Sequence, residues 1–238
     1  MLRLQAVRKT LGEGAHRFSL DIPHLDLVAG QHLALVGPSG SGKSTLLDLL
    51  ALTSSPDRSQ RFEFAPAQQV IDVALLWRKQ QQNLLAELRG RHVGYVLQTG
   101  GLLGFLDVRS NIELPRQLSG LSDETSVEQL AEELGIADQL DKFPRELSVG
   151  QRHRVSCARA LAHAPSLLLA DEPTAALDPL NARRVMQLLL SRAHDQGACC
   201  IIATHDERLV MDAGLGVLRI VCEHDADGGV TATLQVSP

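Results

Sequence analysis

Residues 37–45 constrain the fold of this chain more than any other feature, because they match the phosphate-loop pattern G-x-x-x-x-G-K-[ST]. The glycines allow the backbone to turn tightly, so that several N–H groups can converge on the phosphates of a nucleotide. Lys43 can reach the terminal phosphates, and the hydroxyl of Ser44 can bind Mg²⁺. We therefore expect nucleotide contacts from the whole loop: Gly37, Pro38, Ser39, Gly40, Ser41, Gly42, Lys43, Ser44 and Thr45.

The flanking residues predict a strand before the loop and a helix after it. Residues 32–36 form an apolar run that ends at the loop, and leucines follow the loop at helical spacing. Strand, glycine loop and helix are the order that phosphate binding requires. The alternative is a glycine-rich turn that only connects strand to helix, and the flanking strand and helix patterns argue against it.

Three further apolar runs, residues 93–97, 167–170 and 199–203, each end in polar residues. Continuous apolar runs are typical of parallel strands buried on both faces, and ligands of such sheets bind beyond the carboxyl ends of the strands. The spacing therefore predicts that the polar residues which follow these runs lie near a bound triphosphate: Gln98, Asp171, Glu172 and His205.

The other segments predict a strand-rich entry and a helical insertion. Residues 1–30 alternate apolar and polar positions between glycines, as antiparallel strands do. Residues 53–70 are polar and broken by prolines, whereas residues 70–89 carry apolar positions at helical spacing. Residues 108–146 read as mostly helical, with Ser122 or Asp123 as a possible cap.

Residues 215–236 alternate like a hairpin, with Asp227, Gly228 and Gly229 as its turn. Together these segments predict an α/β fold with a mainly parallel central sheet, an N-terminal antiparallel β subdomain and a helical subdomain at about residues 106–150. A chain of 238 residues with 44% hydrophobic residues can bury the core of one such domain, spanning residues 1–238.

The composition argues against several classes of function. The net charge of −5 provides no global basic field for binding nucleic acid or an anionic membrane. No apolar run approaches the roughly 18 residues of a transmembrane helix, so we expect a cytoplasmic chain that reaches a membrane only through a partner. The cysteines lack metal-ligand spacing, and we expect them to be reduced core residues: Cys157, Cys199, Cys200 and Cys222.

Asp171 and Glu172 are adjacent carboxylates that can perform different tasks. Asp171 can hold Mg²⁺ through water, and Glu172 can orient or polarise an attacking water molecule. Two acidic residues can also simply begin a solvated loop. Their position directly after a buried strand of a phosphate-loop protein favours the chemical interpretation.

Residues 147–151, Leu-Ser-Val-Gly-Gln, closely resemble the LSGGQ signature of ATP-binding cassette (ABC) ATPases. The resemblance extends from about residue 2 to residue 218 and places the other motifs in the family's order. It implies a P-loop NTPase of ABC type that hydrolyses ATP with Mg²⁺. In this resemblance Gln98 is the Q-loop residue and a metal contact, residues 169–172 are the Walker B motif, residues 176–178 are the D-loop that ends at Asp178, and His205 is the switch histidine.

The signature also has a physical interpretation. Ser148 can cap a helix over residues 150–162, and Gly150 leaves backbone N–H groups available to an anion. The chain's own nucleotide already has a phosphate loop, so this second anion site suits an ATP bound by another subunit. The family forms head-to-tail dimers in which each ATP lies between the two motifs. The resemblance thus implies a homodimer, with Ser148, Gly150 and Gln151 contacting the partner's ATP.

Two positions depart from the family pattern. Val149 replaces the first glycine of the signature, which adds a branched side chain beside the phosphate of the second copy. Leu11 occupies the position where the family usually stacks an aromatic ring on adenine. An aliphatic contact lacks a stacking contribution of about 0.5–1.5 kcal/mol. The residues that carry the chemistry are all present, and we expect an active ATPase.

Residues 91–98, 102–103 and 111–115 resemble the subgroup that contains lipoprotein-release and macrolide-export ATPases. In that subgroup a homodimer drives membrane subunits mechanically. The resemblance implies integral membrane permease subunits in a separate chain and a peripheral position at the cytoplasmic face of the inner membrane. An apolar cluster beside the Q-loop suits the contact, although it also suits ordinary core packing: Leu102, Leu103, Phe105 and Leu106.

We therefore expect the ATPase subunit of an ABC transporter or of a transporter-like envelope complex. The alternative is a soluble ABC-type assembly or scaffold ATPase that works as a nucleotide-controlled clamp. A nucleic-acid partner is not expected, because relatives of that kind carry long coiled-coil insertions between the phosphate loop and the signature, and this chain has none.

Overall fold

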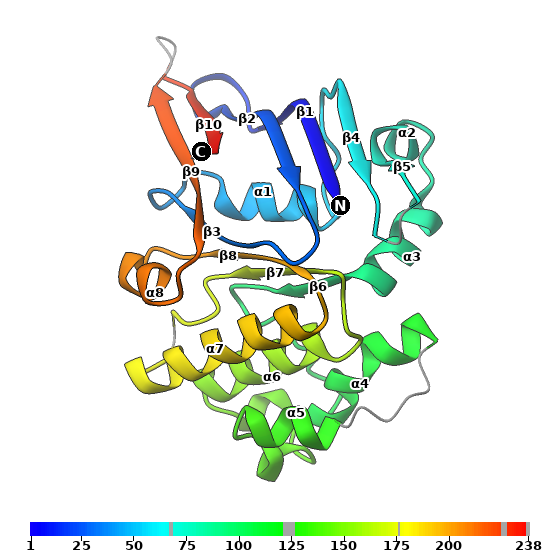
Figure 1. Ribbon diagram of the computed structural model, residues 1–238, viewed down its shortest axis with the longest axis vertical. Helices are drawn as coiled ribbons and strands as arrows, with labels where there is room; N and C mark the ends of the chain where they lie inside the picture. Colours follow the sequence, from blue (N-terminus) through cyan, green and yellow to red (C-terminus); the bar gives the residue numbers. More distant parts are fainter. Residues whose placement is uncertain (67–68, 121–126, 176, 225–227, 237–238) are drawn as a thin grey trace. The chain divides into compact units, whose positions relative to one another are not determined.

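The computed structural model describes residues 1–66, 69–120, 127–175, 177–224 and 228–236 (Figure 1). The chain divides into two compact units. The first combines Met1–Ala86 with Ala203–Pro238, and the second consists of Glu87–Ile202. The phosphate loop and His205 thus belong to the first unit, whereas Gln98, the signature and the two carboxylates belong to the second.

The first unit is built on strands in the order β5-β4-β1-β2-β10-β9-β3. β1 pairs antiparallel with β2 and β4, and β9 pairs antiparallel with β10, which confirms the expected strand-rich entry and C-terminal hairpin. β3 runs parallel to β9, and β10 parallel to β2. Asp227 of the expected turn lies outside the described residues. The strands are β1 (Leu2–Leu11), β2 (Phe18–Leu27), β3 (His32–Val36), β4 (Arg61–Phe64), β5 (Ile71–Asp72), β9 (Gly216–His224) and β10 (Val230–Val236).

The segment between the phosphate loop and residue 92 differs from the sequence prediction in two places. β4 lies within residues 53–70, where no strand was expected, and its Phe62 and Phe64 are buried. The expected helical stretch is divided into β5, α2 (Val73–Arg78) and α3 (Gln82–His92). Asp72 ends β5 and caps α2, because its carboxylate accepts a hydrogen bond from the N–H of Leu75 at 2.8 Å. β4 was not predicted because its two apolar residues, Phe62 and Phe64, are too few to distinguish a strand from a loop.

In the second unit the strand order is β8-β7-β6. β6 (Val93–Val96) and β7 (Leu167–Asp171) pair in parallel, with Val96 opposite Ala170. Every residue of β7 and of β8 (Cys199–Ala203) is buried. This burial explains why both strands are continuous apolar runs, and it confirms the prediction of buried strands in these segments.

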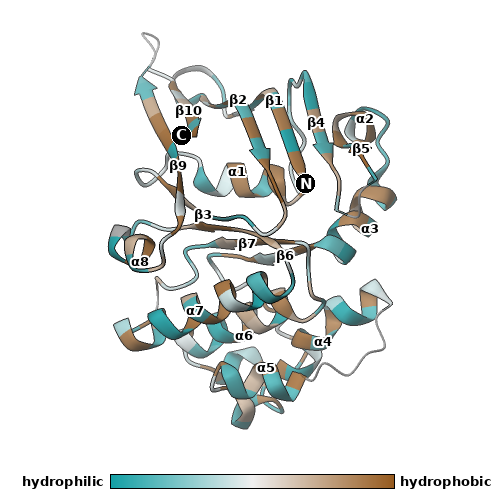
Figure 2. Cartoon of the chain, in the orientation of Figure 1, coloured by the Kyte–Doolittle hydropathy of each residue, from teal (hydrophilic) through white to brown (hydrophobic). Residues whose placement is uncertain are grey.

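Helices make up most of the rest of the second unit, as expected for residues 108–146. Their sequences carry both hydrophobic and hydrophilic residues, visible in Figure 2 as brown and teal along α5, α6 and α7. Asp107 caps α4 by accepting from the N–H of Ser110 at 2.7 Å, and Gly120 ends that helix in the left-handed conformation. Ser122 and Asp123 lie outside the described residues. The helices are α4 (Val108–Ser119), α5 (Val127–Glu133), α6 (Val149–Leu161) and α7 (Pro179–Asp195).

The limits of the expected helical subdomain, and the expectation of one domain over residues 1–238, stay predictions. Among the described residues, no helix is both apolar enough and long enough to pass through a bilayer. Cys157, Cys199 and Cys200 are buried with free thiols, and Cys222 is half-buried and also free.

Candidate nucleotide site

The phosphate loop joins β3 to α1 (Lys43–Leu50) in the first unit. Gly40 and Gly42 adopt φ angles of +75° and +92°, which side chains with a Cβ atom rarely adopt. A Cβ atom on Gly37 would lie 2.6 Å from Ser41 Oγ and 3.2 Å from the carbonyl oxygen of Ile220. Glycine is therefore needed at these three positions for the loop to keep its shape.

The side chain of Lys43 binds the backbone at the start of the phosphate loop. Its side chain is buried, and Nζ donates hydrogen bonds to the carbonyl oxygens of Gly37 at 2.9 Å and of Pro38 at 3.0 Å. The ammonium group is thus fixed over the residues that form the turn. A buried cation in this position can bind an anion at low cost in conformational entropy.

The start of α1 leaves hydrogen-bonding groups available to a phosphate. Its N-cap residue, Gly42, has no side chain to accept from the first N–H groups of the helix. Ser41 Oγ is buried and has no hydrogen-bond partner among the described residues. A helix N-terminus without a side-chain cap, a buried hydroxyl and a fixed ammonium group together fit a phosphate.

His205 lies in the same unit and follows β8. The N–H of Thr204 donates to the carbonyl oxygen of Leu35 in β3 at 3.2 Å, and Thr204 Oγ1 accepts from the N–H of Asp206 at 3.1 Å. Asp206 in turn caps α8 (Glu207–Asp212). His205 is exposed between these two anchored residues. The hydrogen bond from Thr204 to Leu35 holds the adjoining backbone beside β3, the strand that leads into the phosphate loop.

In the second unit, Gln98 and Glu172 follow the carboxyl ends of two neighbouring parallel strands, β6 and β7, at the same edge of the sheet. Val96 of β6 and Ala170 of β7 are partners in the parallel ladder. Gln98 lies two residues after Val96, and Glu172 lies two residues after Ala170. Gln98 is exposed, and Asp171 and Glu172 are only 5% and 9% exposed. The structure confirms that residues following β6 and β7 share one edge, as the strand pattern predicted.

Glu172 adopts a φ angle of +50°, which is unusual for a residue with a side chain. The left-handed conformation costs about 1–2 kcal/mol for such a residue. Buried carboxylates at a strand end are also expensive unless they interact with partners or ligands. The burial of Asp171 and Glu172 argues against the alternative of a solvated loop.

The signature begins α6, with Ser148 as its N-cap. Ser148 Oγ accepts from the N–H of Gln151 at 3.2 Å, and Gln151 Oε1 accepts from the N–H of Ser148 at 2.8 Å. This capping box fixes the first turn of the helix. The helix begins at Val149, one residue before the predicted start, and Val149 is 51% exposed. Gly150 follows within the same first turn.

Asp178 caps α7, and its carboxylate accepts from the N–H groups of Leu180 and Asn181, both at 3.1 Å. These bonds, of which the one from Asn181 contributes most, lower the pKa of the Asp178 carboxyl group below its usual value. Asp178 is exposed. Ala176, the first residue of the expected D-loop, lies outside the described residues.

The segment after Gln98 is held by two side chains whose anchoring role the sequence pattern did not predict. Arg159 donates from Nη1 to the carbonyl oxygen of Gly101 at 2.8 Å and from Nη2 to that of Gly100 at 3.2 Å. Asn111 is fully buried and bonds both the N–H and the carbonyl oxygen of Leu103. An asparagine inside a helical segment gives no signal of such a role.

Each unit, taken by itself, holds an oxygen group of the kind that Mg²⁺ prefers. This ion prefers oxygen ligands and usually binds through one or two carboxylates together with substrate phosphates. Ser44 provides a hydroxyl in the first turn of α1, and Asp171 provides a buried carboxylate in the other unit. Within the described ranges, no group of three or more His, Cys, Asp or Glu side chains is arranged to hold a metal ion.

Comparison with known proteins gives the family. Residues 20–175 match the family model described as ABC transporter. This match covers more than half of the chain, and the chain therefore belongs to the ABC transporter family. Its fold is that of an ABC ATPase cassette, which confirms the resemblance of its motifs.

Individual relatives support the same class. The macrolide export ATP-binding/permease protein MacB of Escherichia coli (strain K12) is 36% identical over 217 residues, which are 90% of this chain and 32% of that protein. The chain thus spans about a third of the length of the curated relatives it matches.

Solved structures agree with this assignment. A dimeric structure of the ATP-binding cassette MJ0796 in a post-hydrolysis state, bound to ADP and Pi, matches with a TM-score of 0.79 and 29% identity. That match covers 97% of this chain and 96% of the other. A second dimeric structure of MJ0796, described as a bacterial ABC transporter cassette, matches with a TM-score of 0.77, 30% identity and the same coverage. The chain is thus similar to the MJ0796 cassette over nearly its whole length and to MacB over about a third of that protein.

Proposed function

We propose that this chain binds and hydrolyses ATP as the motor subunit of a membrane transporter or transporter-like envelope complex. The observation that carries the proposal is the phosphate loop with its buried Lys43, since this loop provides the anion site that a triphosphate requires. The buried carboxylates Asp171 and Glu172 supply the second part of the chemistry.

Within the proposed site, the loop N–H groups and Lys43 hold the β- and γ-phosphates of ATP. Ser44, Asp171 and Gln98 are the residues that would hold Mg²⁺, which when bound neutralises charge on the phosphates. Glu172 accepts a hydrogen bond from the attacking water and orients it toward the γ-phosphate. His205, which follows β8 in the sequence, contacts the γ-phosphate.

We further propose that two copies form a head-to-tail dimer around two ATP molecules. In this arrangement Ser148, Gly150 and Gln151 of one copy bind the γ-phosphate held by the other, and Asp178 lies at the dimer interface. The capped start of α6 supports this role, because a helix N-terminus favours negative charge. The two MJ0796 structures described above are both dimeric.

The proposed partners are integral membrane permease subunits in a separate chain, which would hold this chain at the cytoplasmic face of the inner membrane. The supporting surface is the apolar segment after Gln98. Phe105 is 76% exposed, and Leu102, Leu103 and Leu106 are half-buried around it. An exposed aromatic side chain on a segment anchored by Asn111 suits a contact with another protein.

The test is the variant Glu172→Gln, with Glu132→Gln on the exposed face of α5 as its matched control. We expect Glu172→Gln to bind ATP with unchanged affinity, to lose at least 100-fold in turnover, and to elute as a dimer only with ATP. The control should behave like the parent protein. Unchanged turnover in Glu172→Gln would contradict the assignment of the attacking-water site.

The transporter role has its own test. A tagged protein extracted from membranes in mild detergent should bring down a polytopic membrane protein, and Phe105→Asp should abolish this copurification while ATP binding persists. Copurification of soluble proteins alone would favour an assembly or scaffold ATPase instead.

A further inference from the structure

A hollow of about 370 Å³ lies in the first unit, at the middle of the hairpin that β1 and β2 form. Ala6 and Pro23 line it, together with Arg8, Arg58 and Thr233. Pockets that bind small molecules have volumes from about 300 Å³ upward. None of the described residues that line the hollow belongs to the phosphate loop, so it is a candidate site that the proposed ATPase chemistry does not use.

The ladder of β1 and β2 is interrupted at this hollow. Ala6 and Pro23 lie opposite each other between two paired positions. Pro23 has no N–H group to donate to the ladder, and Ala6 has a φ angle of +48°. Both side chains are short, apolar and exposed. The interruption therefore leaves a small apolar floor on a sheet whose neighbouring positions carry longer side chains.

Charged and polar side chains form one row across the sheet beside this floor. Arg58 forms a β-bridge with Arg8, whose N–H donates to the Arg58 carbonyl oxygen at 2.9 Å. Arg8 in turn pairs with Asp21 of β2, and Asp21 pairs with Thr233 of β10. Paired residues of neighbouring strands project from the same face of a sheet. The row from Arg58 to Thr233 is therefore presented on one face.

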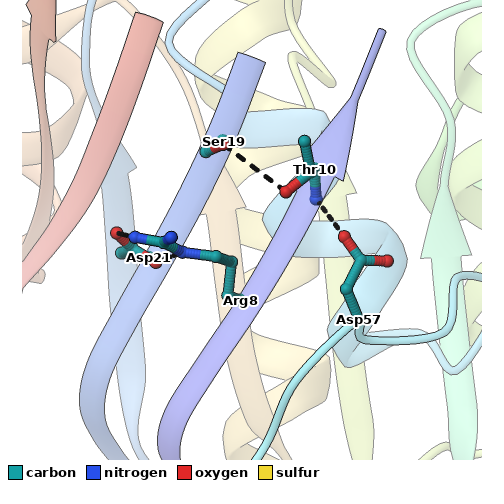
Figure 3. Close-up of polar contacts among 5 residues, drawn as sticks. All are labelled: Arg8, Thr10, Ser19, Asp21 and Asp57. Atoms are coloured by element: carbon teal, nitrogen blue, oxygen red, sulfur yellow. Dashed lines mark hydrogen bonds and ion pairs between the residues drawn. The ribbon is translucent and has the colours of Figure 1, made fainter. Parts of the chain in front are cut away.

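The carboxylates of Asp21 and Asp57 already have cationic partners (Figure 3). Arg8 forms two hydrogen bonds of 2.5 Å with the carboxylate of Asp21. Asp57 accepts from the N–H of Thr10 at 2.6 Å and from Nζ of Lys9 at 3.5 Å. Neither carboxylate is thus left to bind a further cation.

Arg58 supplies a positive charge that the row does not compensate. Its side chain is exposed, and within the part of the chain that the structure describes its guanidinium group forms no hydrogen bond or ion pair. Arg8 and Asp21 compensate each other, so the row has an excess of one positive charge. A guanidinium group presents its N–H groups as a planar fork that matches the two oxygens of a carboxylate.

We propose that this hollow binds a small organic monocarboxylate, with the carboxylate on Arg58 and the apolar body on Ala6 and Pro23. A monoanion matches the single excess charge, whereas a dianion is also repelled by the Asp21 carboxylate. The apolar floor favours a ligand with a hydrocarbon part over a bare inorganic anion. This site is separate from the phosphate loop, and the proposal does not depend on ATP binding.

The experiment uses benzoate as the probe, because it joins one carboxylate to one apolar ring. The ¹H–¹⁵N signals of residues 6–8 and 58 are followed while benzoate is added to the protein. We expect saturable shifts at these residues. Three comparison compounds should bind at least about tenfold more weakly: benzamide lacks the charge, phenyl phosphate can carry a second charge, and acetate lacks the ring.

Variants of Arg58 test which side chain binds the carboxylate. Arg58→Gln should weaken benzoate binding at least about tenfold, and Arg58→Lys, which keeps the charge but loses the planar fork, should lie between that variant and the parent protein. Arg61→Gln is the matched control, because Arg61 is an exposed arginine of β4 that does not line the hollow. Its benzoate affinity should equal that of the parent protein.

Four outcomes would overturn the proposal. No saturable binding of benzoate would mean that the hollow is only a surface depression. Equal weakening by Arg58→Gln and Arg61→Gln would assign the binding to general surface charge. Phenyl phosphate that binds as tightly as benzoate would contradict the preference for a monoanion. Loss of benzoate binding in Lys43→Ala would place the probe in the phosphate loop.

Discussion

Asn111 binds the backbone of Leu103 at both of its polar groups: Oδ1 accepts from the N–H at 2.9 Å, and Nδ2 donates to the carbonyl oxygen at 3.1 Å. The same amide group also reaches the carbonyl oxygens of Leu106 and Asp107 at 3.0 and 2.9 Å. One fully buried side chain therefore holds the segment that carries the exposed Phe105.

We predict that Asn111→Ala lowers the free energy of unfolding of the protein by about 2–4 kcal/mol, because it leaves several buried backbone groups unsatisfied. Amide hydrogen exchange at residues 102–107 should become much faster than in the parent protein. Asn111→Asp, which keeps the acceptor but loses the donor, serves as the comparison. Parent-like exchange at Leu103 in the alanine variant would show that the segment is held by other contacts.

Ser148 offers a way to separate helix capping from phosphate binding. Ser148→Ala should lower stability by about 1 kcal/mol through the lost cap and should also lower ATP turnover. Ser148→Asp keeps a capping oxygen but places a negative charge where the proposed γ-phosphate approaches, so we expect parent-like thermal stability and a loss of turnover. If Ser148→Asp turns over ATP normally, the residue acts only as a cap.

Val149 should limit the ATP-bound dimer. Its branched side chain is 51% exposed at the first residue of α6, where the proposed phosphate of the second copy arrives. In the Glu172→Gln background, we expect Val149→Gly to form the ATP-dependent dimer at several-fold lower protein concentration, as measured by analytical ultracentrifugation. Val149→Ala should give a smaller effect of the same sign. A weaker dimer in both variants would mean that the valine contributes a favourable contact.

His163 makes stability depend on pH. Burial lowers the pKa of its imidazole from 6.5 to about 4, with smaller contributions in the same direction from His92 and Arg116, while a hydrogen bond with the Val93 carbonyl oxygen opposes the shift. Between pH 6.5 and pH 4 the unfolded chain binds the proton more readily than the folded protein. Stability is therefore complete above about pH 6.5 and falls as the pH decreases toward 4, by an amount on the order of 3 kcal/mol.

Urea unfolding at pH 7.5 and pH 5 measures this dependence. His163→Gln is the matched variant, because a neutral amide can still donate to the Val93 carbonyl oxygen but does not titrate. We expect the variant to lose less stability than the parent protein on acidification. Equal losses in the two proteins would assign the pH dependence to other groups.

The sequence predicted the elements whose patterns are long or continuous. The apolar runs of β3, β6, β7 and β8 identified buried strands, and their polar endings predicted which residues leave the same edge. The capping role of Ser148 followed from its residue type and position. These features depend on neighbouring residues in the chain, which a single sequence displays directly.

Features that depend on distant residues were missed. β4 contributes only Phe62 and Phe64 to the core, and such a short alternation carries little signal until β1 is known to lie beside it. Phe18 is visible in the sequence only as an apolar residue at a strand start. Its contact with Gly42 joins residues far apart in the chain, and so does the bond between Arg159 and Gly101.

The strand order of the first unit has a consequence for synthesis of the protein. β9 and β10, which lie between β3 and β2, come from the last residues of the chain, whereas β3 leads into the phosphate loop. The strand that supports the loop thus lacks this neighbour until residues 216–224 have left the ribosome. Residues 87–202 form their compact unit from one continuous segment and are complete earlier. A nascent chain would therefore complete the segment that holds its signature helix before β3 gains its neighbour β9.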